Sequence, residues 1–279
     1  MSAFLLLAAT VSASPDVVGR AAVFYQHTDY AASLHVLAED PAPDAAAFLL
    51  AGKNYYMLGD YKKAIDDFEK ALALSPGNSD YELWLGRAWG QRAETGGWLT
   101  AGMSASKARQ CFEKAVALDP RNHEAMNDLF DFYLNAPVIL GGGIDKAEAI
   151  AKRIARERPP EYQFEEAQLA DRQKQYGEAE MHFRRAMELA PGEPGRVVDL
   201  ARYVAKRGRL EESDALFQQA RKMAPNRPGI VFAEAHTYVE NHRNLEQART
   251  LLREYLRSNL TPDDPPRQAA EKLLRRAGG

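Results

Sequence analysis

Small, aromatic and proline residues recur in a fixed order along the chain. Each copy runs from a small residue through an alanine–aromatic–alanine stretch to a proline, and four copies are clear. They consist of Gly52, Tyr55, Gly59, Tyr61, Ala64, Phe68, Ala71 and Pro76; of Gly86, Trp89, Ala108, Phe112, Ala115 and Pro120; of Ala167, Ala170, Tyr176, Ala179, Phe183, Ala186 and Pro191; and of Ala201, Val204, Gly208, Leu210, Phe217, Ala220 and Pro225.

Each position in this pattern has a physical role. Ala64, Phe68 and Ala71 recur at i, i+4 and i+7, which is the spacing of a buried stripe on an α-helix. The small residue lets a preceding helix approach that stripe, and Gly59 allows the positive φ of a tight turn between the two helices. The proline ends the second helix. One such helix pair cannot bury its own apolar face, so neighbouring pairs must stack.

This pattern resembles the tetratricopeptide repeat (TPR), whose unit of about 34 residues is an antiparallel helix pair. The resemblance extends over residues 14–262, where weaker copies complete about seven helix pairs. It implies an all-α, right-handed superhelical solenoid. Residues 263–279 then predict a capping helix, since Ala270, Leu273 and Leu274 form one apolar face.

Two insertions interrupt neighbouring repeats at the turn between their helices. The first, residues 90–107, places Trp98, Leu99 and Met103 beside glycines, and the second, residues 135–145, carries three consecutive glycines. The two insertions should be neighbours in space. We expect them either to contact a partner, with Trp98, Leu99 and Met103 as anchors, or to pack on their own repeats.

The second insertion also resembles a narrower bacterial group of exported TPR proteins. The similarity rests on the stretches Asn135-Ala136-Pro137 and 141–147, which combine Ala-Pro, Gly-Gly and Lys-Ala. It implies export but no particular activity.

Residues 1–13 differ from the rest of the chain. Phe4 to Val11 is a short apolar run, and small residues follow it where a signal peptidase cuts. No lysine or arginine precedes the run, so an apolar turn on the first helix is the alternative. We expect a signal peptide and a periplasmic or secreted protein; if the segment is retained, a cytoplasmic protein is expected.

Composition excludes several classes of protein. With 46% hydrophobic residues the chain is not disordered, and no apolar run approaches the length that spans a bilayer. A net charge of −3 disfavours nucleic acid as a partner. The charge is uneven, at −6 for residues 1–140 and +3 for residues 141–279.

No catalytic, cofactor or metal site is expected. Cys111 neighbours the buried stripe and is expected to act as a small core residue. His236 and Glu240 are spaced as one helical pair, but two ligands make a poor metal site. Gly141 to Gly143 lack the lysine and serine or threonine of a phosphate-binding loop.

Recognition of a partner is the remaining function. In this fold the inner helices line a concave groove that holds a protein or peptide segment. The helical phase places these residues in the groove: Lys53, Tyr56, Arg87, Asn127, Asp131, Gln168, Asp171 and Arg202. The lysine, asparagine and arginine arrangement by which some TPR domains hold chaperone C-termini is absent from the first three inner helices.

The leading hypothesis is a non-enzymatic scaffold that binds a protein or peptide through its concave face and insertion edge. The alternatives are a cytoplasmic adaptor and a periplasmic accessory protein with a small apolar ligand beneath Trp98 and Ile139. The last alternative requires a closed apolar cavity under those two side chains.

Overall fold

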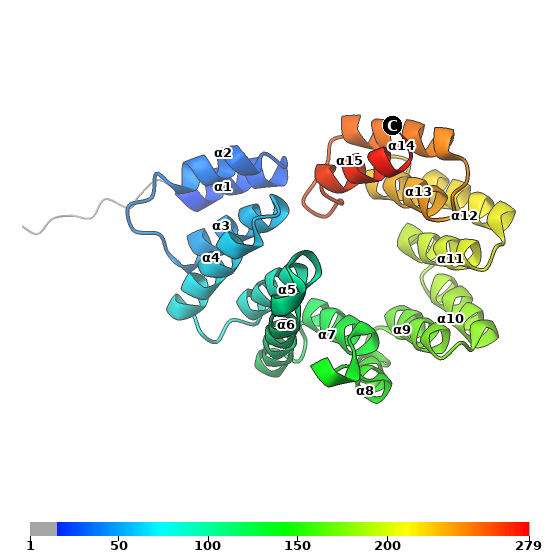
Figure 1. Cartoon of the computed structure of the whole chain (residues 1–279), viewed down its shortest axis with the longest axis horizontal. Helices are drawn as coiled ribbons and strands as arrows, with labels where there is room; N and C mark the ends of the chain where they lie inside the picture. Colours follow the sequence, from blue (N-terminus) through cyan, green and yellow to red (C-terminus); the bar gives the residue numbers. More distant parts are fainter. Residues whose placement is uncertain (1–15, 279) are drawn as a thin grey trace, which may run out of the picture.

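A computed structural model describes residues 16–278, and fifteen α-helices and one 3-10 turn lie in that range (Figure 1). The helices are α1 (Val17–Gln26), α2 (Tyr30–Leu37), α3 (Ala45–Met57), α4 (Tyr61–Leu74), α5 (Ser79–Thr95), α6 (Trp98–Leu118), α7 (His123–Asn135), α8 (Ile144–Ile154), α9 (Pro159–Arg172), α10 (Tyr176–Leu189), α11 (Pro194–Lys206), α12 (Leu210–Met223), α13 (Pro228–Glu240), α14 (Leu245–Arg257) and α15 (Arg267–Arg276).

The first fourteen helices form seven consecutive pairs, and α15 packs on the last pair. The odd-numbered helices α3 to α13 line the inside of a curved stack, and their even-numbered partners lie outside (Figure 1). The all-α solenoid with seven pairs and a capping helix, predicted from the repeat, is confirmed. Ala270 and Leu273 of α15 are buried against the end of the stack, which shields its apolar face from water.

Each pair is held by a close approach between its two helices. A Cβ atom built on Gly52 of α3 would lie 2.5 Å from the ring of Phe68 in α4. One built on Gly86 of α5 would lie 2.6 Å from the ring of Phe112 in α6. Both rings are buried, so the absence of a side chain on the facing helix sets how close the helices come.

The turns inside five of the seven pairs share one backbone conformation. Gly59 and Gly208 have φ values of +79° and +80°, as the sequence predicted. Thr28, Lys174 and His242 occupy the same place in their pairs, and they too have positive φ although they carry side chains. Residues other than glycine adopt this conformation at a cost of about 1 kcal/mol or more.

The third pair differs from the expectation of an inserted turn. Residues 90–107 are helical apart from Gly96 and Gly97, so they lengthen the helices and do not form a long loop. Helix α5 has 17 residues and α6 has 21, against 13 and 14 for α3 and α4. Gly96 follows the end of α5, and Gly97 precedes the start of α6. The other inserted residues, apolar ones included, lie within these two helices.

The second insertion is a compact turn. Residues Val138–Leu140 form a 3-10 turn, and Gly141 follows with a φ of +95°. A Cβ atom on Gly102 of α6 would lie 3.7 Å from Leu140, so the two insertions are neighbours, as expected.

The stack curves until its two ends approach each other (Figure 1). The turn between α1 and α2 and the segment between α14 and α15 line opposite walls of one small cavity of about 190 Å³. Thr28 to Ala31 contribute from the first side, and Leu260, Thr261 and Asp264 to Gln268 from the second. The interior of the solenoid is therefore nearly encircled by the chain.

Residues 1–13 lie outside the described range, and the signal peptide stays a prediction. Within residues 16–278 no helix has the length and apolar character needed to cross a membrane.

Two glycines of α5 test the close packing. We expect Gly86→Ala to destabilise the protein by about 1–3 kcal/mol, because the new methyl group overlaps the Phe112 ring. Gly90→Ala is the matched control, because nothing lies within 4 Å of its Cβ position and alanine favours the helix by about 1 kcal/mol. Urea denaturation followed by circular dichroism measures both. Equal effects of the two substitutions would contradict the proposed contact.

Candidate functional site

A continuous groove follows the inner helices. One cavity of about 680 Å³ lies against α5, α6 and α7, and a second of about 570 Å³ lies against α9 and α11. Asn135 and Gln168 line both, while Arg202 and Lys206 are shared with a third cavity at α13. Because each cavity shares its walls with the next, the groove runs from α5 to α13.

Trp84 of α5 lies beside the first part of the groove and contacts two residues that line it, Tyr56 and Arg87. The Lys53 ammonium lies 4.6 Å and the Arg87 guanidinium 5.0 Å from the centre of its ring, while Tyr56 packs edge-on against it. Burial lowers the pKa of Lys53 and raises the pKa of Tyr56 to about 12. Of the residues predicted for the groove, Tyr56 and Arg87 line the first cavity, whereas Lys53 lies against the Trp84 ring beside it.

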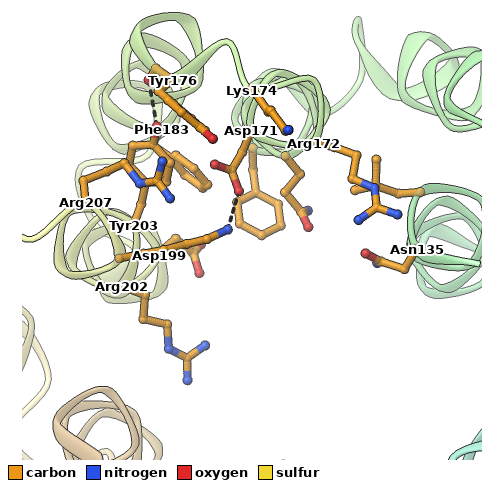
Figure 2. Close-up of a pocket in the computed structure, with 14 residues that line it drawn as sticks. Asn135, Asp171, Arg172, Lys174, Tyr176, Phe183, Asp199, Arg202, Tyr203 and Arg207 are labelled. Carbon is orange, nitrogen blue, oxygen red and sulfur yellow. Dashed lines mark hydrogen bonds and ion pairs between the residues drawn. The ribbon is translucent and has the colours of Figure 1, made fainter. Parts of the chain in front are cut away.

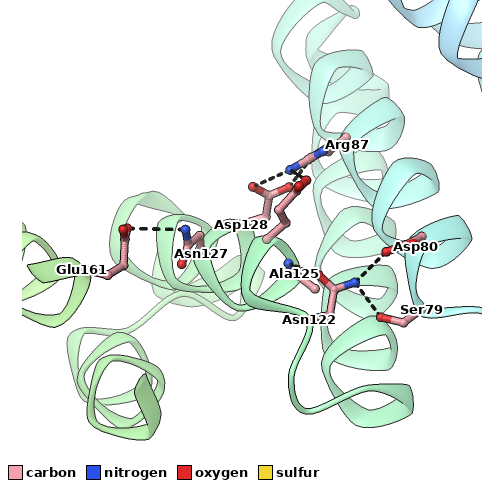
Figure 3. Close-up of polar contacts among 9 residues, drawn as sticks. Ser79, Asp80, Arg87, Asn122, Ala125, Asn127, Asp128 and Glu161 are labelled. Carbon is pink, nitrogen blue, oxygen red and sulfur yellow. Dashed lines mark hydrogen bonds and ion pairs between the residues drawn. The ribbon is translucent and has the colours of Figure 1, made fainter. Parts of the chain in front are cut away.

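Ion pairs and hydrogen bonds link successive inner helices (Figure 3). Arg87 Nε of α5 donates to Asp128 Oδ2 of α7 at 2.6 Å, and Asn127 Nδ2 of α7 donates to Glu161 Oε1 of α9 at 3.4 Å. Glu161 in turn pairs with Arg196 of α11. These contacts hold four neighbouring repeats together along the groove wall.

The second part of the groove combines cations with aromatic rings (Figure 2). Lys206 Nζ of α11 lies 2.6 Å from Asp171 Oδ2 of α9. The Arg207 guanidinium lies 4.2 Å from the centre of the Tyr176 ring, and the Tyr203 ring packs on Phe183. Three of the residues assigned to the groove from the sequence, Gln168, Asp171 and Arg202, line this same cavity.

Four carboxyl groups in or beside the groove have raised pKa values: Asp128, Asp131, Glu165 and Asp199. Asp131 of α7 lines the first cavity, and burial together with the nearby Asp128 and Glu161 raises its pKa to about 6. Asp131 is nevertheless exposed, because the concave wall surrounds its carboxyl group without covering it. Glu165 of α9 is 1% exposed, its two carboxyl oxygens have no hydrogen-bond partner among the described residues, and burial raises its pKa to about 8.

Apolar side chains gather at the edge formed by the two insertions. Leu99 and Met103 of α6 are 76% and 57% exposed, and Ile139 is 91% exposed. The side chain of Trp98 lies outside what the structure describes. Ile139 points to solvent, and the cavity beside it contains the charged residues Arg87, Asp128 and Asp131. Ile139 therefore does not cover a closed apolar cavity, which the small-ligand alternative requires of it.

Several groove residues were missed by sequence reasoning. Lys206 lies four residues after Arg202 on the same helical face, so helical phase was a sufficient signal for it. Lys174 and Tyr176 come from a turn and a helix start, where phase gives no prediction. Asp128 lines the first cavity and lies three residues before Asp131, so helical phase was a sufficient signal for it as well.

Charged, amide and aromatic side chains in the groove offer binding contacts. Cys111 packs against the core, and burial raises the pKa of its thiol to about 12, which disfavours the thiolate. Within the described part of the chain, no cluster of three or more histidine, cysteine or carboxylate residues could hold a metal ion.

The chain is similar to known repeat proteins. The tetratricopeptide repeat family model matches residues 45–78 and 160–193. A TPR protein from Parabacteroides merdae is 13% identical, with a TM-score of 0.61 over 94% of this chain and 98% of its own. A TPR protein from Thermus thermophilus is 21% identical, with a TM-score of 0.54 over 67% of this chain and 97% of its own.

A larger structure has the same fold. A chain of the APC/C hetero-tetramer Cut9–Hcn1 is 17% identical, with a TM-score of 0.51 over 94% of this chain and 48% of its own. No curated protein matches this sequence. At these identities the structural likeness shows the fold, and the two family matches show the repeat.

The Glu165→Gln variant tests the buried carboxyl. In the unfolded chain this group loses its proton above about pH 4.5, whereas the folded protein retains the proton up to about pH 8. Between these two pH values the unfolded state binds fewer protons than the folded state. The free energy of unfolding therefore falls as the pH rises, by at most about 1.4 kcal/mol per pH unit. Glutamine stays neutral and removes that fall.

We expect Glu165→Gln to have a larger free energy of unfolding than the unchanged protein, and we expect this difference to increase from pH 5 to pH 8. Urea denaturation at each pH measures it. Glu178→Gln, at an exposed position of α10, controls for the glutamine itself. A gain that does not change with pH would show that Glu165 is ionised in the folded protein.

Proposed function

We propose that this tetratricopeptide-repeat protein is a non-enzymatic scaffold that binds a protein or peptide partner through its concave groove and its insertion edge. The observation that carries the proposal is the groove itself, which continues over α5 to α13 with charged, amide and aromatic side chains in its walls. Extended polypeptides bind such surfaces through side-chain pockets and hydrogen bonds. The Cut9–Hcn1 assembly contains a chain of the same fold within a complex.

The insertion edge supplies a second contact surface in this proposal. Leu99, Met103, Val138 and Ile139 are exposed aliphatic side chains on two neighbouring segments. Exposed apolar groups that lie together favour contact with another molecule, since that contact removes them from water.

We also propose that the protein works in the cell envelope. The support is the apolar run Phe4 to Val11 followed by small residues, which fits a signal peptide. Mass spectrometry of the protein from its own cells tests this proposal. A mature chain that begins near Ser14 is expected, and an intact Met1 or Ser2 would contradict export and favour the cytoplasmic adaptor.

Site-specific photo-crosslinking in the producing cells tests the binding surfaces. A photoreactive amino acid is placed at Gln168 in the groove, at Ile139 on the edge, or at Glu69 on the outer helix α4, all positions with accessible side chains. The proposal predicts the same discrete adduct from Gln168 and Ile139 and none from Glu69.

Each outcome separates one part of the proposal from another. An adduct from Gln168 alone retains the groove and removes the edge, and an adduct from Ile139 alone does the reverse. Adducts from Glu69 alone would place the partner on the outer surface and contradict the proposed function.

A further inference from the structure

The two main cavities of the groove carry opposite charge. The walls of the first contain Glu94, Asp128 and Asp131 against the single cation Arg87. The walls of the second contain five cations and two carboxylates, the cations being Arg172, Lys174, Arg202, Lys206 and Arg207. Since the cavities share Asn135 and Gln168, a ligand that lies along the groove meets both charges in succession.

The cations of the second cavity are available to a ligand. Lys206 is neutralised by Asp171, but Arg172, Lys174, Arg202 and Arg207 make no ion pair with any carboxylate among residues 16–278. Arg202 extends into the open part of the groove (Figure 2). Arg207 is held against the Tyr176 ring, which fixes its guanidinium before any ligand arrives.

Lys174 is maintained in an unfavourable backbone conformation. Its φ is +64° at a turn position where two other pairs have glycine. A lysine there costs about 1 kcal/mol or more relative to glycine. The chain thus has a cation at the cavity where glycine would make a more stable turn.

The first cavity also has a carboxylate that is available to a ligand. Asp128 is paired with Arg87, whereas Asp131 is exposed in the cavity wall and makes no ion pair with any cation in the described range. Asp131 lies on α7, two inner helices before Arg202 on α11. At about 8–10 Å per helix spacing, that separation is roughly 20 Å, or about six residues of extended chain.

We propose that the groove selects an extended peptide of bipolar sequence, with a basic residue at Asp131 and acidic residues over Arg202, Arg207 and Lys174. This inference rests on the proposed function and names the chemistry of the partner. A nucleic acid fits the groove less well, because its regularly spaced phosphates would meet Asp131 and Glu94 in the adjoining cavity.

Labelled synthetic probes test the proposal by fluorescence anisotropy. The bipolar probe is a twelve-residue peptide with two lysines at one end, four glutamates at the other and glycine and serine between them. Two further peptides replace either the lysines or the glutamates by serine, and the fourth probe is decauridylate. We expect the bipolar peptide to bind most tightly, the acidic peptide next, and the basic peptide and decauridylate weakest.

Matched variants test which residues of the groove bind each end of the peptide. Arg202→Glu should weaken the bipolar and acidic peptides roughly three- to tenfold, whereas Arg153→Glu, the same change on the outer helix α8, should leave both unchanged. Asp131→Asn should weaken the bipolar peptide and not the acidic one. Lys174→Gly should weaken acidic binding while raising the melting temperature, an outcome that loss of folding cannot produce.

The results distinguish this inference from the proposed function. Equal effects of Arg202→Glu and Arg153→Glu, or tighter binding of decauridylate than of the acidic peptide, would overturn it. If no peptide binds but the Gln168 photo-adduct persists, the groove still binds a partner and the bipolar recognition is wrong.

Discussion

The close approach of two helices within each repeat is the contact on which the rest of the structure depends. A residue without a bulky side chain faces a buried phenylalanine ring, as Gly52 faces Phe68 and Gly86 faces Phe112. Ala167 and Ala201 occupy the same place in later pairs and are fully buried. Because the distance between paired helices is set by one small residue and one ring, successive pairs have similar dimensions and stack as a regular solenoid.

Regular stacking brings side chains of successive inner helices within hydrogen-bond reach. Arg87 meets Asp128 and Asn127 meets Glu161, each across a boundary between repeats (Figure 3). Glu161 in turn meets Arg196 across the next boundary. These pairs neutralise part of the groove wall. Cations and carboxylates that remain outside them, such as Arg202 and Asp131, therefore define the charge that a partner encounters.

The fold followed from the sequence because each repeat encodes its own helices locally. The stripe Ala64, Phe68 and Ala71 and the turn glycine Gly59 each act within one pair, so reading them requires no knowledge of distant contacts. The groove was only partly predictable. Arg202, predicted from helical phase, lines the second cavity, whereas Lys174 reaches the same cavity from a turn.

The insertions show another limit of sequence reasoning. Residues 90–107 were expected at the turn between two helices, yet all of them except Gly96 and Gly97 belong to α5 or α6, which pack against each other. The glycines mark only the point where the chain reverses direction. The same charge asymmetry that divided the sequence into an acidic and a basic half recurs in the groove as two cavities of opposite charge.

Amide hydrogen exchange of the partner complex tests the central claim most directly, since it reports on every repeat at once. The account predicts that a bound partner slows exchange in the groove-lining ends of α7, α9 and α11 and in the turn that contains Lys174. The outer helices α4, α8 and α12 should exchange as in the free protein. Protection confined to those outer helices would contradict the assignment of the concave groove as the binding surface.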